Sequence, residues 1–284
     1  MLFGILAALS FSLMALFVKF AADIPTQELI LARSIFTLVA SLAVIKSQSL
    51  SVWGKKGNWP FLLLRGFAGY LALSAYFFSI TKLPLGVASL IQYLSPVFSA
   101  ILAYYFLRED SSFRQWICLA FGLIGVGFVS GVLPFGRLDA SVPLVYWLAC
   151  ILSAVISGVA YSTVRKLNLT GESADVIIFY FPLVSFPFAL LASLQQWVTP
   201  TLLQGLNIFL VCLFSYIGQL FLTFSLRSEK TSAATNMLYF GALFASTWGF
   251  MFLNEHPTLG FFIGATLIIG TQLVFGKKQI KPKT

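Results

Sequence analysis

Charged residues are scarce in this chain. The 18 Lys and Arg and 9 Asp and Glu make up only 10% of its 284 residues, against roughly 25% in ordinary globular domains. Hydrophobic residues reach 59% and the mean hydropathy is +0.92. A water-soluble fold of this composition would have too little polar surface to cover itself. The scarcity of charge therefore excludes a soluble protein and indicates a chain that lies in a lipid bilayer.

The chain also lacks the groups that catalysis and metal binding need. Histidine occurs once, as His256, and the three cysteines lie inside apolar runs, where they behave as small hydrophobic residues. No cluster of His, Cys and acidic residues, no Gly-rich phosphate loop and no serine-nucleophile motif occurs. We therefore expect no enzyme, no metal site and no cofactor. The cysteines are Cys118, Cys150 and Cys212.

The net charge of +9 does not imply a nucleic-acid partner. The basic residues stand singly or in pairs at the ends of apolar runs, where they act as topology signals. The partner expected from the composition is the lipid bilayer.

Ten apolar runs follow one another along the chain. A helix that rises about 1.5 Å per residue crosses about 30 Å of hydrocarbon in about 20 residues, and none of the runs alternates as a β-barrel strand does. The sequence thus predicts an all-α transmembrane fold of ten helices with no separate catalytic domain. The runs are 2–22, 28–46, 60–80, 85–107, 113–132, 143–165, 174–194, 203–225, 231–253 and 258–276.

Ten spans place both termini on one side of the membrane. The connections divide the 18 basic residues 14 to 4, and the smaller share is Lys19, Arg33, Lys82 and Arg137. Under the positive-inside rule the richer side is cytoplasmic. We expect both termini in the cytoplasm and place the chain in a bacterial plasma (inner) membrane.

The chain matches itself when it is shifted by 146 residues. Six identities fall within the 22 positions 88–109, and they pair Tyr93 with Tyr239 and Glu109 with Glu255. Because five spans are an odd number, a second copy must enter the membrane from the opposite side, as in the inverted repeats of secondary transporters. The predicted inverted five-helix repeats are residues 1–140 and 141–284.

Polar side chains inside four of the spans recur at helical spacing. A charge at the centre of a membrane helix costs about 2.5–3.5 kcal/mol on insertion scales, so polar groups at mid-depth need a reason. Intervals of three, four and seven residues place such groups on one face of a helix. We interpret them as lining a central substrate cavity. They are Tyr70 and Ser74 in the third span, Ser89, Gln92 and Tyr93 in the fourth, Tyr216 and Gln219 in the eighth, and Thr235, Asn236 and Tyr239 in the ninth.

Close packing of helices is the competing interpretation of these polar residues. It is favoured for the serines and threonines. A cavity is favoured for the amides and phenols, because bulky groups are poor close-packing residues. Prolines inside the spans, Pro96, Pro182 and Pro187, predict kinks that either shape a gate or serve packing.

Two pairs of glycines lie four residues apart. These pairs, Gly127/Gly131 and Gly260/Gly264, let a neighbouring helix approach closely. Packing within the chain is the main interpretation and a dimer contact is the other, so we expect a monomer or a weak homodimer.

No acidic residue lies at the middle of a span. Coupling to protons through a central Asp or Glu is therefore disfavoured. Glu28, at the outer end of the second span, is the acid best placed to join a pathway. Lys19, Arg33 and Arg65 lie inside the ends of their spans, and snorkelling to the interface is the main interpretation for all three. The other interpretation is a role in binding an anionic substrate or in latching an extracellular gate.

Four motifs connect the chain to a known family. They are Leu64-Arg65-Gly66-Phe67, Leu83-Pro84-Leu85-Gly86-Val87-Ala88-Ser89-Leu90, Ser95-Pro96 and Phe106-Leu107-Arg108-Glu109. With ten spans and a five-plus-five repeat, the chain resembles the drug/metabolite transporter superfamily and, within it, the EamA-like family. The resemblance covers essentially the whole chain. The second half departs from the pattern, because the stretch before its fourth span, Glu229–Ala234, has no proline.

The resemblance implies an alternating-access carrier. Spans 1 to 4 and 6 to 9 would line its cavity, and spans 5 and 10 would be peripheral. Relatives export amino acids and other metabolites, or exchange nucleotide sugars, phosphorylated sugars or S-adenosylmethionine.

The function expected is a secondary transporter, acting as an exporter, exchanger or facilitator of a small polar metabolite such as an amino acid. The alternatives are an exchanger of nucleotide-type or S-adenosylmethionine-type metabolites, and a non-transporting receptor or assembly subunit. The neutral and aromatic candidate residues suit zwitterionic or uncharged solutes better than strongly anionic ones.

Overall fold

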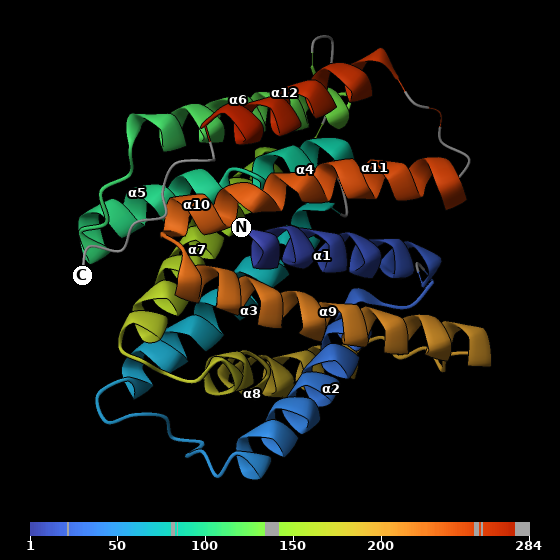
Figure 1. The fold of residues 1–284 in the computed structure, drawn as a ribbon. Helices are drawn as coiled ribbons and strands as arrows, with labels where there is room; N and C mark the ends of the chain where they lie inside the picture. Colours follow the sequence, from blue (N-terminus) through green and yellow to red (C-terminus); the bar gives the residue numbers. More distant parts are fainter. Residues whose placement is uncertain are drawn as a thin grey trace.

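The computed structural model describes residues 1–21, 23–80, 83, 85–133, 142–252, 256 and 258–275, without the side chains of 77, 80, 85–87 and 89. Within these residues all regular secondary structure is helical, and the helices are joined by turns and irregular connections (Figure 1). The helices are α1 (Leu2–Phe20), α2 (Thr26–Ser47), α3 (Trp59–Ile80), α4 (Leu85–Gln92), α5 (Ser95–Leu107), α6 (Phe113–Val129), α7 (Leu144–Leu169), α8 (Ala174–Ser193), α9 (Leu202–Ser228), α10 (Thr231–Asn236), the 3-10 turn η1 (Met237–Tyr239), α11 (Phe240–Phe252) and α12 (Leu259–Phe275).

These elements form ten rods, because α4 continues into α5 and α10 continues through η1 into α11. Each rod covers one of the ten predicted apolar runs. Within the described residues, six rods are long and apolar enough to cross a membrane: α1, α2, the rod over Leu90–Leu107, α7, α8 and α9. Two shorter apolar helices cover Phe113–Val129 and Leu259–Val274. The prediction of an all-α transmembrane fold is confirmed.

The fourth and ninth rods are interrupted, and this corrects the prediction of one continuous polar stripe along each. The first break lies at Tyr93 and Leu94, just before Pro96 in the first turn of α5. A proline ring collides with the carbonyl four residues earlier, here that of Gln92, which is where α4 ends. In the ninth rod the helix tightens into η1, a form that often marks a hinge. By contrast, α8 continues through both of its prolines.

Large apolar side chains are exposed on the flanks of the rods. Val39 in α2 is 64% exposed and Leu148 in α7 is 56% exposed. Apolar side chains exposed in such number indicate contact with lipid or protein. Within the part of the chain that is described, the three cysteines are buried and free, as expected for small hydrophobic residues.

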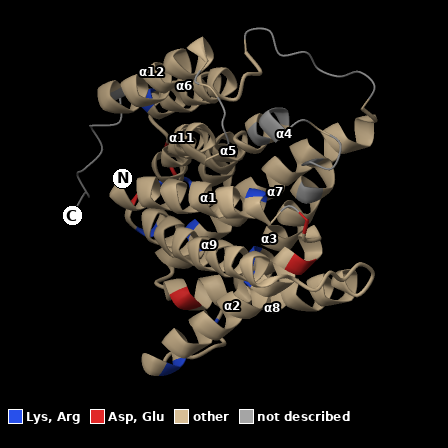
Figure 2. Ribbon diagram, turned by 90° about the vertical axis from the view of Figure 1, so that its right-hand side faces the viewer, with Lys and Arg blue, Asp and Glu red and all other residues tan. Residues whose placement is uncertain are grey.

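The rods pack in pairs that join the two halves of the chain (Figure 1). Helix α1 packs against α9, and α3 packs against α7. Helices α2 and α8 lie together on one flank, and α6 and α12 lie together on the other, in both views (Figures 1 and 2). Helix α5 contacts α7, while α11 contacts α1. Two of these contacts, α2 with α8 and α6 with α12, join equivalent rods of the two predicted repeats. The others form equivalent pairs: the contact of α1 with α9 corresponds to that of α3 with α7, and the contact of α5 with α7 corresponds to that of α1 with α11.

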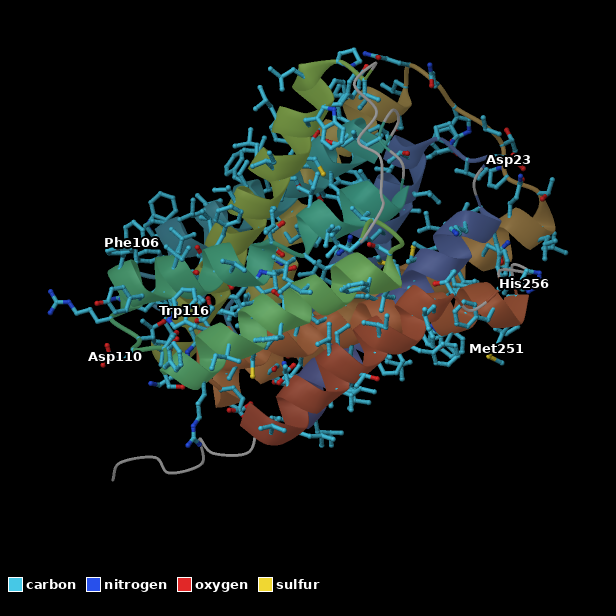
Figure 3. All side chains as sticks on the ribbon, turned by 90° about the horizontal axis from the view of Figure 1, so that it is seen from above. Asp23, Phe106, Asp110, Trp116, Met251 and His256 are labelled. Carbon is cyan, nitrogen blue, oxygen red and sulfur yellow. The ribbon has the colours of Figure 1, made fainter. Side chains whose placement is uncertain are left out.

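The two ends of the bundle are clearly separated. Figure 3 shows Asp23, Met251 and His256 at one end and Phe106 and Asp110 at the other. Helix α1 begins and α12 ends on the same side (Figure 1). Charged positions are few on the ribbon (Figure 2). The arrangement agrees with an even number of crossings.

Glycines allow α6 and α12 to touch along their backbones. A Cβ added to Gly264 would lie 2.3 Å from the carbonyl oxygen of Gly125, and one on Gly260 would lie 2.8 Å from that of Phe128. The predicted packing within the chain is therefore present at Gly260 and Gly264. On α6 the contact uses Gly125, whereas Gly127 lies against Leu133.

We expect Gly264→Leu to lower the free energy of unfolding by about 1–3 kcal/mol, because the added side chain overpacks a backbone contact. Gly270→Leu on the same helix is the matched control, since nothing lies within 4 Å of a Cβ at that position. Thermal unfolding in detergent measures both variants. Equal midpoints would show that α6 and α12 do not pack through Gly264.

Candidate functional site

The two helix breaks lie against each other. Tyr93 follows α4 and Tyr239 ends η1, and they are 146 residues apart, the shift that aligns the two halves of the chain. Their ring centroids are 6.0 Å apart with a tilt of 55° between the ring planes. Equivalent residues of two repeats touch each other only near the axis that relates the repeats. The breaks therefore lie at the junction of the two halves.

Tyr239 is fully buried, and its hydroxyl oxygen finds no hydrogen-bond partner among the described residues. Its ring packs against Gly122 of α6, where a Cβ would approach the ring to 2.3 Å. The Tyr93 hydroxyl lies close to Gly241, 2.8 Å from the position of a Cβ there. An unpaired phenol in an apolar core is costly, and buried Tyr hydroxyls usually have a partner.

Two more candidate residues hold buried oxygens that are unpaired within the described structure. These are Asn236 Oδ1, on a residue only 2% exposed, and Ser74 Oγ on α3. Thr235 differs, because its hydroxyl donates to the Thr231 carbonyl at 2.8 Å and lies 3.3 Å from Ser99 Oγ. Thr235 is thus satisfied by protein groups, whereas Asn236 and Ser74 keep capacity for another partner.

Gln92 is held by α7. Its Nε2 donates to Ser157 Oγ at 2.9 Å, and its Oε1 accepts from Ser153 Oγ at 2.9 Å. The side chain therefore ties the end of α4 to α7, and the packing interpretation fits Gln92 better than the cavity interpretation.

The remaining candidates are spread over several helix contacts. The Tyr70 ring stacks on Phe188 of α8 at 5.1 Å, and the Tyr216 ring meets Phe36 of α2 edge-on at 6.3 Å. Gln219 is buried in α9. Ser89 lies in α4, and its side chain is outside the described part of the structure.

The charged candidates lie in different surroundings. The carboxylate of Glu28, which is buried, accepts a hydrogen bond from the Val198 backbone N–H at 3.1 Å, so it anchors the loop before α9. Lys19 is exposed near the end of α1. Arg33 lies with its guanidinium carbon 5.0 Å from the centre of the Phe181 ring.

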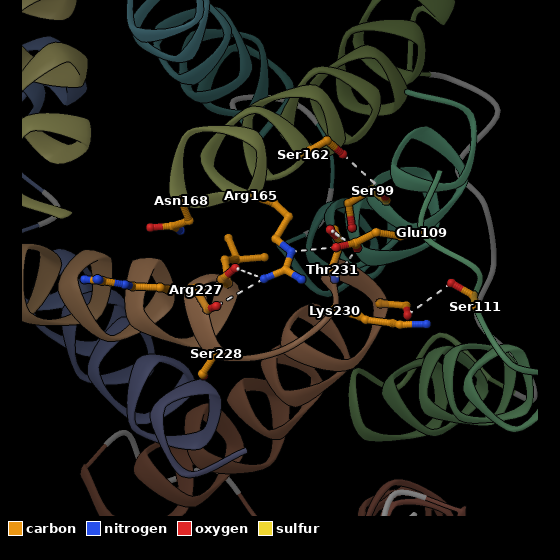
Figure 4. Close-up of polar contacts among 12 residues, drawn as sticks. Ser99, Glu109, Ser111, Ser162, Arg165, Asn168, Arg227, Ser228, Lys230 and Thr231 are labelled. Atoms are coloured by element: carbon orange, nitrogen blue, oxygen red, sulfur yellow. Dashed lines mark hydrogen bonds and ion pairs between the residues drawn. The ribbon is translucent and has the colours of Figure 1, made fainter. Parts of the chain in front are cut away.

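A polar cluster at the end of the bundle that holds Met1 joins the two halves (Figure 4). Arg165 Nε on α7 donates to Glu109 Oε1 at 2.6 Å, and Glu109 Oε2 accepts from the backbone N–H of Thr231 at 2.9 Å and from its hydroxyl at 3.0 Å. Arg165 Nη1 donates to the carbonyls of Leu226 and Arg227 at 2.9 and 3.1 Å. We call Glu109, Arg165 and Thr231 the clasp.

The clasp satisfies the exposed backbone of two successive helices. Arg165 binds the last carbonyls of α9, and Glu109 binds the first N–H of α10, the ends that favour a cation and an anion. Both charged side chains are only 10–11% exposed. Sequence reasoning did not assign the clasp, although the repeat alignment marks both Glu109 and Arg165 by pairing them with Glu255 and Lys19.

Residues 1–131 match the model of the EamA-like transporter family. The match covers 131 of the 284 residues, so the likeness to this family is seen in the first half of the chain. This family and the relatives described in the next paragraph are transporters and not enzymes. The expectation that the chain is a transporter and not an enzyme is therefore confirmed. With its apolar helices, the chain is an integral membrane protein.

Similar proteins span nearly the whole chain. The pseudopaline exporter CntI of Pseudomonas aeruginosa is 29% identical over 94% of this chain and 92% of its own length. Solute carrier family 35 member G1 of Homo sapiens is 28% identical over 95% of this chain and 77% of its own. The S-adenosylmethionine uptake transporter of Rickettsia bellii is 24% identical over 80% and 77%.

The fold is also found among solved structures. One of them superposes with a TM-score of 0.82 and 19% identity, and the match covers 95% of this chain and 93% of that one. At this identity the likeness concerns the arrangement of helices alone.

Proposed function

We propose that the chain is a secondary transporter that moves a small polar metabolite, such as an amino acid or a related compound, by alternating access. Its binding site lies where the two broken rods meet. The observation that carries this proposal is the pair of breaks, at Tyr93–Leu94 and at η1, with the rings of Tyr93 and Tyr239 facing each other across them. Discontinuous helices at the junction of inverted repeats build the substrate sites of many secondary transporters.

The two moving parts in this proposal are the repeats 1–140 and 141–284, whose boundary lies outside the described residues. The matched helix contacts of the two halves support the repeat. Rocking of one repeat against the other would open the site alternately to each side. The clasp joins α5 of the first repeat to α7 and α10 of the second, so it holds one end of the bundle closed and must separate when that end opens.

The substrate class rests on the unpaired groups of the site and on the relatives. Asn236 Oδ1, Ser74 Oγ and the Tyr239 hydroxyl offer neutral polar contacts beside aromatic rings. Such groups suit a small polar solute with an apolar or aromatic portion. An S-adenosylmethionine-type metabolite is the second candidate, because the Rickettsia proteins that match the chain are named S-adenosylmethionine uptake transporters.

A stabilisation screen followed by counterflow tests this function. The purified full chain is heated with single amino acids, nucleosides and S-adenosylmethionine, and a binder at a hundredfold excess over its Kd adds about 2.7 kcal/mol of stability. Proteoliposomes loaded with the unlabelled binder should then accumulate the labelled form by exchange. A binder that never crosses the membrane would contradict the transporter and favour a receptor.

Topology provides a separate prediction. We propose that the end of the bundle bearing Met1 and Lys56 faces the cytoplasm of a bacterial inner membrane, and that Gln196 faces outward. Single cysteines placed at 56 and 196, in a chain with its three native cysteines replaced, should differ in labelling. On intact cells an impermeant thiol reagent should label only position 196. Equal labelling of both would contradict this orientation.

A further inference from the structure

Arg65 is a buried cation with two nitrogens that are unpaired among the described residues. The residue is only 4% exposed, and both Nε and Nη1 lack a hydrogen-bond partner in the described part of the chain. A buried charge is strongly unfavourable unless it is paired and hydrogen-bonded. Snorkelling to the interface, one of the two roles expected for this residue, would leave the guanidinium exposed, which it is not.

A second arginine faces the same aromatic ring. The guanidinium carbons of Arg33 on α2 and Arg65 on α3 lie 5.0 and 5.4 Å from the centre of the Phe181 ring of α8. Neither arginine forms an ion pair with a described carboxylate. Two like charges thus converge on one ring without a protein counter-ion.

The surroundings make room for the Arg65 guanidinium. Gly69 lies one helical turn after Arg65, and a Cβ there would approach Arg65 Nη1 to 2.3 Å and the Phe181 ring to 2.6 Å. The guanidinium therefore occupies space that any other residue at position 69 would fill. A cation–π contact uses no N–H hydrogen bond, so the unpaired N–H groups of Arg65 keep their capacity for another partner.

The second half of the chain has no arginines at the positions equivalent to Arg33 and Arg65. The shift that aligns the two halves places Phe179 and Val211 at the positions equivalent to Arg33 and Arg65. Only the first half carries the charge, so a ligand bound between the halves would meet positive charge on one side only. An asymmetric ligand with one anionic end fits such a site.

We propose that Arg33, Arg65 and Phe181 form a subsite for a carboxylate group of the transported solute. This rests on the proposed transport function and names the chemistry of its substrate. A carboxylate accepts two parallel hydrogen bonds from a guanidinium fork, which would satisfy the unpaired Arg65 nitrogens. The neutral groups near Tyr239 would then contact the rest of the solute. This extends the expectation of a zwitterionic solute by assigning the partner of its anionic end.

The test measures thermal unfolding of the purified full chain with succinate, with its neutral diamide succinamide and with inorganic phosphate, all at equal ionic strength. Succinate should raise the unfolding temperature and succinamide should not. In Arg65→Met the apparent Kd for succinate should rise about 10- to 100-fold, the loss expected for hydrogen bonds to a charged group. Arg33→Gln should also raise the apparent Kd for succinate. This variant replaces Arg65→Met in the test if Arg65→Met does not fold.

Two further readouts separate ligand binding from a structural role. Without any anion, Arg65→Met should be at least as stable as the natural chain, because an unpaired buried charge is removed. Arg114→Gln, at an exposed arginine of α6, should keep the full succinate response. Lower stability of Arg65→Met together with an unchanged succinate response would overturn the subsite, and so would equal shifts with succinate and succinamide. Stronger stabilisation by phosphate than by succinate would overturn the carboxylate assignment.

The outcomes for the subsite and for transport are distinct. If a solute exchanges across the proteoliposome membrane while succinate and succinamide shift the unfolding temperature equally, the subsite is wrong and the transport function stands. If the succinate response depends on Arg65 but no solute exchanges, the anion site stands and the transport function falls.

Discussion

Glu109→Gln is expected to lower the free energy of unfolding by about 3–5 kcal/mol, the cost of removing one partner of a largely buried ion pair. The variant leaves Arg165 without its counter-charge, although the side chain is only about one-tenth exposed. It also weakens the acceptor for the first N–H of α10. Denaturant unfolding of the purified chain measures the loss.

The order of the charges in the clasp is fixed by the helix ends. The double variant Glu109→Arg with Arg165→Glu restores an ion pair, but it places a cation at the start of α10 and an anion at the end of α9. Both placements oppose the helix dipoles and lose the backbone hydrogen bonds of the natural pair. We expect the exchanged pair to remain as unstable as Glu109→Gln. Recovery of stability would mean that the ion pair alone matters.

Glu229→Gln is the matched control for this prediction. Glu229 pairs with the amino group of Met1 at 3.1 Å, with exposed fractions of 21% and 42% for the two side chains. Exposed ion pairs contribute about 0–1 kcal/mol. A loss in Glu229→Gln as large as that in Glu109→Gln would show that any charge near this end of the bundle has the same effect.

The fold followed from hydropathy because each rod is a separate apolar run. The structure differs where the helices protrude from the apolar region, since α7 reaches Leu169 and α9 reaches Ser228, a few residues beyond the predicted runs. Polar residues such as Arg165 and Arg227 ended the hydropathy signal there. The helices continue because backbone hydrogen bonding does not depend on hydropathy.

The site could be predicted only in part. Pro96 gives a local signal for the first helix break, whereas Met237–Tyr239 carries no residue that forbids a helix, and only the alignment with Tyr93 marks it. The meeting of Arg33 and Arg65 on Phe181 depends on how α2, α3 and α8 pack, which no spacing within one helix can give. Sequence reasoning identified polar groups at mid-depth but could not separate Gln92, which protein groups satisfy, from Asn236, which they do not.

That difference between Gln92 and Asn236 leads to opposite expectations for two similar substitutions. Asn236→Leu removes a buried oxygen that is unpaired within the described structure and replaces it with an apolar group of similar size. Such a change is neutral or stabilising. Gln92→Leu removes hydrogen bonds to Ser153 and Ser157 and should cost about 1–3 kcal/mol, because the Ser157 hydroxyl loses its partner, whereas Ser153 keeps the Ala72 carbonyl as an acceptor.

The effects of these two substitutions on transport should be ranked in the opposite order to their effects on stability. If Asn236 contacts the solute, Asn236→Leu leaves a polar group of the solute unpaired in a dry site, and counterflow should fall about 10- to 100-fold while the protein stays folded. Gln92→Leu should lose activity only in proportion to its loss of folded protein. Thr235→Val, at a residue already satisfied by Thr231 and Ser99, is the neighbouring control and should retain exchange. Full exchange by Asn236→Leu would remove Asn236 from the site and shift the binding site toward Ser74 and the arginine subsite.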